Sequence, residues 1–379
     1  MNVALFLTYD YSLKTWSDSG TLDKELKIYK ELNKKHGVKF TIFSYGDVDD
    51  ISILKNQINN NEINVIPIYS LVKKNKNKYL RFIKSLFLPF VIKKRIKDIS
   101  IIQQHQLYGV WVSLLLSKIL RIPYYLRTGY DEYSFSIYEK KNILKILFNK
   151  VLTSLGLKYS DIYSVTSLTD LTFLKNQFNI DTSKVKIRPN WVTNNNKVNI
   201  SNRKRNKLLS VGRLVEQKYF SLLIKEFSGS KDELEIEIIG DGYEYSYLKN
   251  LAKENDVDLK IIKKLSNDKI LKKLNEFTFF ISTSKFEGNP KTILEAMSTG
   301  CVVFASDIKA HAELIKNGKN GILYDMENPK LYTIYKDLIS DDQKIVMISD
   351  EATNHILKNN LLDDVTKLYF QDYQLISSR

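Results

Sequence analysis

Two carboxylates carry the clearest chemical signal in this sequence. Glu287 and Glu295 stand eight positions apart in the segment FEGNPKTILEAMSTG, which directly follows the apolar run TFFIST. One Glu is expected in a loop and the other inside a helix, so they could accept hydrogen bonds from two different sets of hydroxyl groups. The alternative is that neither Glu binds a ligand: Glu287 would be a solvated loop residue and Glu295 a surface helix residue, since this spacing also arises by chance.

The residues between these carboxylates predict a helix start that suits a diphosphate. Asn289 is expected to be the N-cap residue, Pro290 the first helical residue, and Gly300 the residue that ends the helix. The free backbone N–H groups and the positive end of the helix dipole would then bind an anion.

Two cations follow another predicted strand, in the segment LLSVGRLVEQKYF. Gly212 allows a tight turn, Arg213 comes directly after it, and Lys218 follows in the same segment. A guanidinium can hold phosphate oxygens bidentately and an ammonium adds a point charge, so the two could offset a diphosphate. The alternative is one of many Lys-rich surfaces with no ligand.

Three further segments could be mistaken for phosphate or metal motifs. The GDG of IEIIGDGYEYSYL lacks the third Gly and the Lys-Ser/Thr of a Walker loop, so we interpret it as a plain turn. Two Asp-Val-Asp triplets, at 47–49 and 256–258, fall in predicted turns. We expect neither a catalytic metal nor another cofactor, because a Lys/Arg clamp makes a divalent ion unnecessary.

Short β-branched runs alternate with longer helical patterns along the chain, which is typical of parallel sheets covered by helices on both faces. A polar stretch, NNNKVNISNRKRNK, interrupts this alternation and indicates a domain boundary. We predict an N-terminal domain at 1–195, on which a C-terminal helix at about 361–379 can pack back, and a C-terminal domain at 196–360. The predicted strands are 3–9, 38–45, 63–68, 99–103, 124–128, 162–166 and 185–188, then 208–211, 235–239, 259–262, 278–282, 302–305 and 322–324.

Length, charge and cysteine content limit the class of protein. A chain of 379 residues favours two domains, and its single cysteine, Cys301, excludes a disulfide within the chain. The formal net charge of +15 suggests an anionic partner. Nucleic acid is not expected, because no binding module or Arg-rich stripe is recognisable. The longest apolar stretches are much shorter than the ~20 residues that span a bilayer, so we expect a cytoplasmic protein.

The segment 72–97 is the most basic part of the chain. About ten basic residues alternate there with Tyr79, Phe82, Phe87 and Phe90. Such a band can lie on anionic lipid, with its apolar side chains in the membrane, at the inner face of the plasma membrane. A solvated helix with a core-facing stripe is the alternative.

The order and spacing of the motifs resemble glycosyltransferase family 4, over nearly the whole second half of the chain. The resemblance implies the GT-B fold, an α/β architecture with two Rossmann-like domains that face each other across a cleft. It rests on Ser210-Val-Gly-Arg-Leu with Lys218, Ile238-Ile-Gly-Asp-Gly, Phe286-Glu-Gly-Asn-Pro-Lys, Leu294-Glu-Ala-Met, Gly300, Glu313, Gly318 and Gly321.

The family resemblance also implies roles for single residues. Arg213 and Lys218 would hold the donor diphosphate and stabilise it as it leaves, Glu295 would bind the ribose hydroxyls, and Glu287 would contact the donor sugar. The catalytic residues implied are Glu287, Arg213, Lys218 and His105. The donor-binding residues implied are Gly212, Arg213, Lys218, Glu287, Gly288, Asn289, Pro290, Lys291, Thr292 and Glu295, together with Gly20.

The first half resembles the family more loosely. Gly20 stands in SDSGT, which follows the first predicted strand and opens a helix, and His105 resembles a histidine near the donor sugar. Arg127 and Gly129 resemble an acceptor-side loop. Asn190 precedes the linker, where a hinge and a substrate contact are both open.

The function implied is retaining transfer of a hexose or N-acetylhexosamine from a nucleotide diphosphate sugar, with a UDP-sugar favoured. The acceptor expected is a saccharide, lipid-linked, in bacterial surface polysaccharide or glycoconjugate synthesis. The alternatives are a sugar epimerase or phosphorylase of the same fold, and a non-catalytic glycosyltransferase-like partner subunit.

Overall fold

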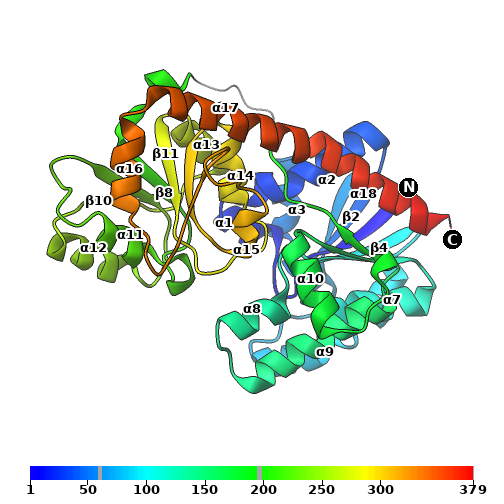
Figure 1. Cartoon of the computed structure of the whole chain (residues 1–379). Coiled ribbons are helices and arrows are strands. Elements are labelled where there is room, and N and C mark those ends of the chain that lie inside the picture. The colour runs from blue at the N-terminus through cyan, green and yellow to red at the C-terminus, as the bar shows by residue number, and fades with distance from the viewer. Residues whose placement is uncertain (59–61, 194–198, 379) are drawn as a thin grey trace. The chain divides into compact units, whose positions relative to one another are not determined.

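The computed structural model describes residues 1–58, 62–193 and 199–378 (Figure 1). The chain divides into two compact units: unit 1 is Met1–Pro189 with Asp363–Arg379, and unit 2 is Asn190–Leu362. The boundary expected between residues 195 and 196 lies outside the described residues. Each unit contains one parallel sheet covered by helices, as the alternating pattern predicts.

Unit 1 is built on a seven-stranded sheet of order β3-β2-β1-β4-β5-β6-β7, in which every pairing is parallel. Its strands are β1 (Asn2–Phe6), β2 (Lys39–Ser44), β3 (Ile63–Pro67), β4 (Ile101–His105), β5 (Tyr124–Arg127), β6 (Ile162–Val165) and β7 (Val185–Ile187). Its helices are α1 (Leu13–Asp18), α2 (Leu22–His36), α3 (Asp49–Lys55), α4 (Ile68–Leu71), α5 (Lys78–Ser85), α6 (Leu88–Ile92), α7 (Val110–Leu120), α8 (Glu132–Tyr138), α9 (Ile143–Tyr159) and α10 (Leu168–Gln177), with short 3-10 turns at Lys93–Arg95 and Thr182–Lys184.

Unit 2 repeats the architecture with a six-stranded parallel sheet of order β10-β9-β8-β11-β12-β13. Its strands are β8 (Lys204–Val211), β9 (Glu235–Ile239), β10 (Asp258–Ile262), β11 (Phe277–Ser282), β12 (Val302–Ser306) and β13 (Ile322–Tyr324). Its helices are α11 (Phe220–Glu226), α12 (Tyr245–Glu254), α13 (Asn267–Leu274), α14 (Lys291–Ser298), α15 (Lys309–Ala312), α16 (Leu331–Ile339) and α17 (Asp342–Asn359), with 3-10 turns at Ile200–Asn202 and Glu216–Lys218.

The strands are apolar on both faces because helices cover both sides of each sheet. In β12, Val302 and Phe304 belong to one buried cluster of unit 2, whereas Val303 and Ala305 belong to the cluster on the opposite face. The thirteen strands predicted from such runs are all present, and their ends move by up to four residues. The largest shift is at β8, which begins at Lys204 because its first residues are polar and carry no apolar signal.

The last helix, α18 (Leu362–Ser377), packs on unit 1 over nearly its whole length (Figure 1). The buried Asp372 accepts hydrogen bonds from Arg188 Nε (2.7 Å) and from the Tyr125 hydroxyl (3.0 Å). The Tyr369 hydroxyl accepts one from Arg127 Nε (2.9 Å), and Tyr373 donates to a buried Gln103. These contacts attach the end of the chain to β4, β5 and the segment after β7.

The Asp372–Arg188 pair gives the first testable prediction. Asp372→Ala leaves the Arg188 guanidinium largely buried without its partner, so we expect a loss of about 3–5 kcal/mol in the free energy of unfolding. Asp364→Ala on the same helix removes an exposed ion pair with Lys367 and should cost no more than about 1 kcal/mol. Urea unfolding of both variants tests this, and equal losses would contradict it.

Candidate functional site

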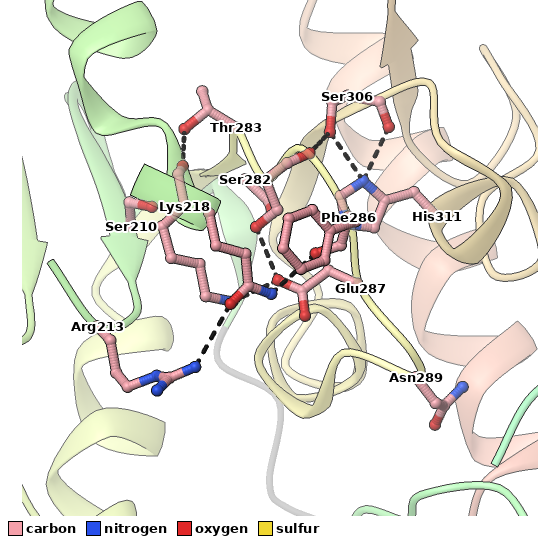
Figure 2. Close-up of polar contacts among 12 residues, drawn as sticks. Ser210, Arg213, Lys218, Ser282, Thr283, Phe286, Glu287, Asn289, Ser306 and His311 are labelled. Atoms are coloured by element: carbon pink, nitrogen blue, oxygen red, sulfur yellow. Dashed lines mark hydrogen bonds and ion pairs between the residues drawn. The ribbon is translucent and has the colours of Figure 1, made fainter. Parts of the chain in front are cut away.

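The candidate site lies at the carboxyl ends of β8 and β11 in unit 2. These strands are neighbours in the middle of the sheet, and the strand order reverses between them. Ligands of open parallel sheets bind at such a reversal, outside the carboxyl ends of the strands. The loop after β8 carries Arg213 and Lys218, and the loop after β11 carries Glu287, so the topology brings the predicted side chains together (Figure 2).

An ion pair joins these two loops. The Lys218 ammonium contacts Glu287 Oε1, and Ser284 Oγ donates a hydrogen bond to the same oxygen (2.7 Å). The two side chains are only 16% and 11% exposed. Burial alone would raise the pKa of Glu287, but the charge and hydrogen bond of Lys218, with the bond from Ser284, lower this pKa below its usual value. Lys218 and Glu287 therefore form a charged pair at a partly buried position.

Glycine makes room for the Lys218 side chain. The lysine stem lies against Gly212, where an added Cβ would come within 3.1 Å of Lys218 Cε. A Cβ at Gly240 would meet the Gly212 carbonyl oxygen at 1.8 Å, and one at Gly242 would meet the Leu214 oxygen at 2.3 Å. The GDG segment is therefore more than the plain turn we expected: its glycines let the loop after β9 touch the loop that carries the cations.

Arg213 is exposed beside this pair. Its Nη2 donates to Gln217 Oε1 (3.4 Å), and Gln217 Nε2 donates to the Phe286 carbonyl (2.9 Å). The Lys218 carbonyl accepts a hydrogen bond from Thr283 Oγ1 (2.7 Å). The cationic loop is thus fastened to the end of β11, while Arg213 stays exposed.

Glu295 is buried on α14 and is not the surface residue that the alternative required. Its Oε1 accepts a hydrogen bond from Asn267 Nδ2 (2.9 Å), at the start of α13. This partner could not be predicted from the sequence, because α13 precedes β11 and meets α14 only through the tertiary fold. A carboxylate fixed in this way can present its second oxygen in a defined direction.

The start of α14 differs from the prediction. Pro290 is the N-cap residue, Lys291 and Thr292 open the helix, and no described side chain caps it. Asn289 Oδ1 instead accepts the Asn190 backbone N–H (2.9 Å), and Asn190 Nδ2 donates to the Asn289 carbonyl (2.6 Å). The N-cap prediction for Asn289 is wrong because this pairing occupies its carboxamide.

The other end of α14 is as expected. Gly300 has a φ of +82° and follows the last turn, which is the left-handed conformation that ends many helices. Gly288 and Asn289 are buried between Glu287 and the helix start. The segment from Phe277 to Gly300 therefore forms the strand, loop and helix that the motif predicted, with Pro290 in place of Asn289 as the N-cap residue.

His311 is a site residue that the sequence reasoning missed. Its Nδ1–H donates to the Ser306 carbonyl (2.8 Å), and its Nε2 is buried with no hydrogen-bond partner among the described residues. Burial lowers the pKa of His311 to about 4, although the nearby Glu287 carboxylate acts in the opposite direction. Figure 2 shows the imidazole beside Phe286 and Glu287. The available signal in the sequence was a histidine shortly after the end of a strand, because that strand, β12, lies next to β11 in the sheet.

The first-half candidates lie in unit 1. His105 is buried at the end of β4, with Nδ1 3.1 Å from the Tyr29 hydroxyl and 3.3 Å from Arg127 Nη1. Its Nε2 lies 3.6 Å from Glu25 Oε2. Arg127 is buried as well and bonds to Tyr369, so the acceptor-loop prediction for Arg127 is wrong: its guanidinium holds the interior of unit 1 together.

Gly20 occupies a place other than the expected one, whereas Gly129 lies in the loop after β5 and its acceptor-side role stays a prediction. Helix α1 intervenes between β1 and Gly20, so this glycine does not follow the first strand directly. It is exposed, has a φ of +67°, and joins α1 to α2. The Gly129 N–H donates to Gln106 Oε1 (2.8 Å), and an added Cβ would meet this side chain at 2.7 Å.

No group of three or more His, Cys, Asp or Glu is placed to hold a metal ion among residues 1–58, 62–193 and 199–378. In the same part of the chain, every helix is too short or too polar to cross a bilayer.

Comparisons with known proteins agree with this geometry. The model of a family described as "Glycosyl transferases group 1" matches residues 192–355, which are most of unit 2. The N-acetylgalactosamine-N,N'-diacetylbacillosaminyl-diphospho-undecaprenol 4-alpha-N-acetylgalactosaminyltransferase of Campylobacter jejuni is 26% identical over 286 residues, 72% of this chain and 76% of that protein. The amylovoran biosynthesis glycosyltransferase AmsD of Erwinia amylovora is 23% identical over 338 residues, 86% of this chain and 88% of the relative.

A solved structure has the same fold over nearly the whole chain. Anabaena HepE, crystallised with UDP and glucose, gives a TM-score of 0.76 at 17% identity and covers 98% of this chain and 99% of its own. Together, the two parallel-sheet units and these relatives show that the chain is a glycosyltransferase with the GT-B fold.

His311 gives a prediction about acid stability. Its pKa lies at about 4 in the folded protein and at 6.5 ordinarily, so between these values the unfolded chain binds a proton that the folded chain does not. Stability therefore falls as the pH falls through this window. From pH 7 to pH 5, wild type should lose about 2 kcal/mol more unfolding free energy than His311→Gln. Urea unfolding at both pH values measures this, and identical losses would show that the histidine is not buried neutral.

Proposed function

We propose that the chain is a retaining glycosyltransferase of family 4 that takes a hexose or N-acetylhexosamine from a nucleotide diphosphate sugar. The observation that carries this proposal is the pairing of Lys218 with Glu287 beside Arg213, at the switch point of the unit 2 sheet. Two cations suit the diphosphate, and the carboxylates suit the hydroxyl groups of the rings. No metal or other cofactor is needed for this division of roles.

In the proposed reaction, the diphosphate leaves the anomeric carbon while its negative charge grows. Arg213 and Lys218 are already in place to stabilise that charge, which is how preorganised groups lower a barrier. The acceptor oxygen forms its bond to the anomeric carbon on the face that the diphosphate leaves, and the acceptor proton passes to the departing phosphate oxygen. This same-face route needs no covalent nucleophile and retains the anomeric configuration.

The carboxylates are proposed to recognise the two ends of the donor. Glu287 would contact hydroxyls of the transferred sugar, since it pairs with Lys218 at the diphosphate, and Glu295 would accept from the ribose hydroxyls. The buried imidazole of His311 lies near Glu287 and keeps a neutral group beside this carboxylate. A role for His105 at the donor sugar stays a prediction.

A UDP-sugar donor and a lipid-linked saccharide acceptor are supported by the names of the relatives. HepE was crystallised with UDP and glucose, and the Campylobacter relative is named for a diphospho-undecaprenol substrate. AmsD is named for the biosynthesis of a polysaccharide. We therefore propose a place in bacterial surface polysaccharide or glycoconjugate synthesis, at the cytoplasmic face of the plasma membrane, with segment 72–97 on anionic lipid.

Alanine variants test the donor site. Arg213→Ala and Glu287→Ala should each lower the transfer rate by about 10²–10³, because each removes a preorganised group at the leaving diphosphate or the sugar. Lys285→Ala is the matched control, since this exposed neighbour pairs with Glu216 and should leave the rate unchanged. The measurement is release of nucleotide diphosphate in the presence of acceptor, and wild-type rates in both variants would sink the proposal.

A ligand screen identifies the donor for that assay. UDP-, GDP- and ADP-sugars are compared by thermal shift, and the correct donor at ~100 times its Kd should add about 2.7 kcal/mol of stability. The same screen on the alanine variants confirms that they remain folded.

Charge neutralisation tests the membrane contact. Lys93, Lys94 and Arg95 changed together to Gln should weaken binding to phosphatidylglycerol vesicles roughly hundredfold, at about 1 kcal/mol per charge near the surface. The control changes three exposed lysines of unit 2 to Gln: Lys231, Lys249 and Lys253. Co-sedimentation that is the same for both triple variants would contradict a specific role of segment 72–97.

A further inference from the structure

The positive charge of the chain is concentrated in two segments of unit 1. Segments 72–97 and 140–159 together contain fifteen Lys or Arg residues and no Asp or Glu, and the whole chain has a formal net charge of +15. The remaining residues are therefore balanced in charge. A general surplus of lysine would have spread over both units, so this concentration indicates a surface for an anionic partner.

The same two segments expose large apolar side chains. In the first, Tyr79 is 70% exposed and Phe87 63%. Helix α9 in the second segment carries exposed apolar residues three to four positions apart, as one face of a helix would: Ile143, Leu144, Leu147, Val151, Leu155 and Tyr159. An exposed apolar stripe with lysines beside it suits contact with an anionic bilayer.

An aromatic cluster joins the two segments. Phe82 of α5 lies 6.1 Å from Phe148 of α9 between ring centroids, and both rings pack around Trp111 of α7. Trp111 Nε1–H also donates to Ser85 Oγ (2.9 Å). The exposed stripes are therefore neighbours on one region of unit 1 rather than two separate patches.

A mostly apolar cavity of about 270 Å³ opens within this region, close to the lower size of typical ligand pockets. Its walls include Tyr9, Tyr69, Val72, Leu88 and Val91. The polar side of the cavity is organised by an ion pair, because Asp10 Oδ2 accepts from Arg81 Nε (2.9 Å) and Nη2 (2.7 Å), and Asp10 Oδ1 accepts from the Tyr69 hydroxyl (2.7 Å).

Two lysines remain for a ligand at the edge of this cavity. Asp10 neutralises Arg81, whereas Lys73 and Lys84 line the cavity and are exposed. An apolar space with cations at its edge fits a molecule that is apolar at one end and anionic at the other. A purely polar saccharide would leave the apolar wall without a partner.

We propose that this cavity binds the hydrocarbon chain of a lipid phosphate, with the phosphate beside Lys73 and Lys84, while α5, α6 and α9 lie on the anionic bilayer that supplies the lipid. This inference rests on the proposed function, because it makes the lipid part of the acceptor a recognised group. The enzyme then selects its acceptor by the carrier lipid as well as by the sugar.

A cavity-filling substitution tests the site with dodecyl phosphate, used below its micelle concentration and followed by calorimetry. Val91→Trp fills a cavity wall and should weaken binding at least tenfold, since each excluded methylene costs about fourfold in affinity. Phe90→Trp is the matched control, because Phe90 is the residue before Val91, is exposed and is not part of the wall. Lys84→Glu tests the anionic end independently and should weaken binding as well.

The outcomes separate this inference from the proposed function. Binding of dodecyl phosphate by Val91→Trp and Lys84→Glu at wild-type affinity would overturn it, as would full competition by inorganic phosphate, which has no chain. Stabilisation by UDP-glucose should be the same in all variants. If UDP-sugars fail to stabilise even wild type, the donor assignment fails, whereas the dodecyl phosphate result still decides on the cavity.

The α9 stripe is tested with vesicles. Leu144→Glu with Leu147→Glu should abolish co-sedimentation with phosphatidylglycerol vesicles and leave the chain folded, since both side chains are exposed. Val346→Glu with Met347→Glu, two exposed apolar residues of α17 in unit 2, is the control. Unchanged vesicle binding of the α9 variant would exclude the bilayer as the occupant. A wild-type dimer that this variant abolishes would assign the stripe to a second copy instead.

Discussion

The Lys218–Glu287 ion pair is the interaction on which the candidate site depends. It joins the loops after β8 and β11, and these two strands lie at the place where the strand order of the unit 2 sheet reverses. A lysine and a glutamate that neutralise each other can both be kept in a partly buried place, because neither is left as an unpaired charge. In the proposed function, the donor diphosphate would replace the carboxylate as the partner of the lysine, and the carboxylate would then contact the sugar.

The rest of unit 2 serves to hold this pair in position. The glycines at 212, 240 and 242 allow the loops after β8 and β9 to touch, and the lysine stem lies over the first of them. His311 and Ser284 surround Glu287 with neutral groups, so the charge balance of the site is set by the cations and the carboxylate alone. Unit 1 has a different proposed role. Its concentrated positive charge and exposed apolar stripes would bind the acceptor lipid.

The sequence predicted the strands because parallel strands buried on both faces leave continuous apolar runs. It also predicted which loops carry the site, since polar residues that follow adjacent strands must meet at one edge of the sheet. It could not predict features that depend on distant partners. Asn289 fails as a cap because Asn190 engages it, Arg127 is buried because α18 covers it, and His311 is in the site only because β12 lies beside β11. The concentration of basic residues was present in the sequence. That α9 belongs to the same surface became clear only from its exposed face in the structure.

Calorimetric titration of UDP tests the central claim most directly, because it separates the diphosphate from the sugar. Lys218→Ala should weaken UDP binding by roughly tenfold or more, the loss of one charge-assisted contact. Glu287→Ala should leave UDP affinity within about threefold of wild type, since the carboxylate is assigned to the sugar and is only a substitute partner for the lysine in the free enzyme. Unchanged UDP affinity in Lys218→Ala, or an equal loss in both variants, would contradict the account.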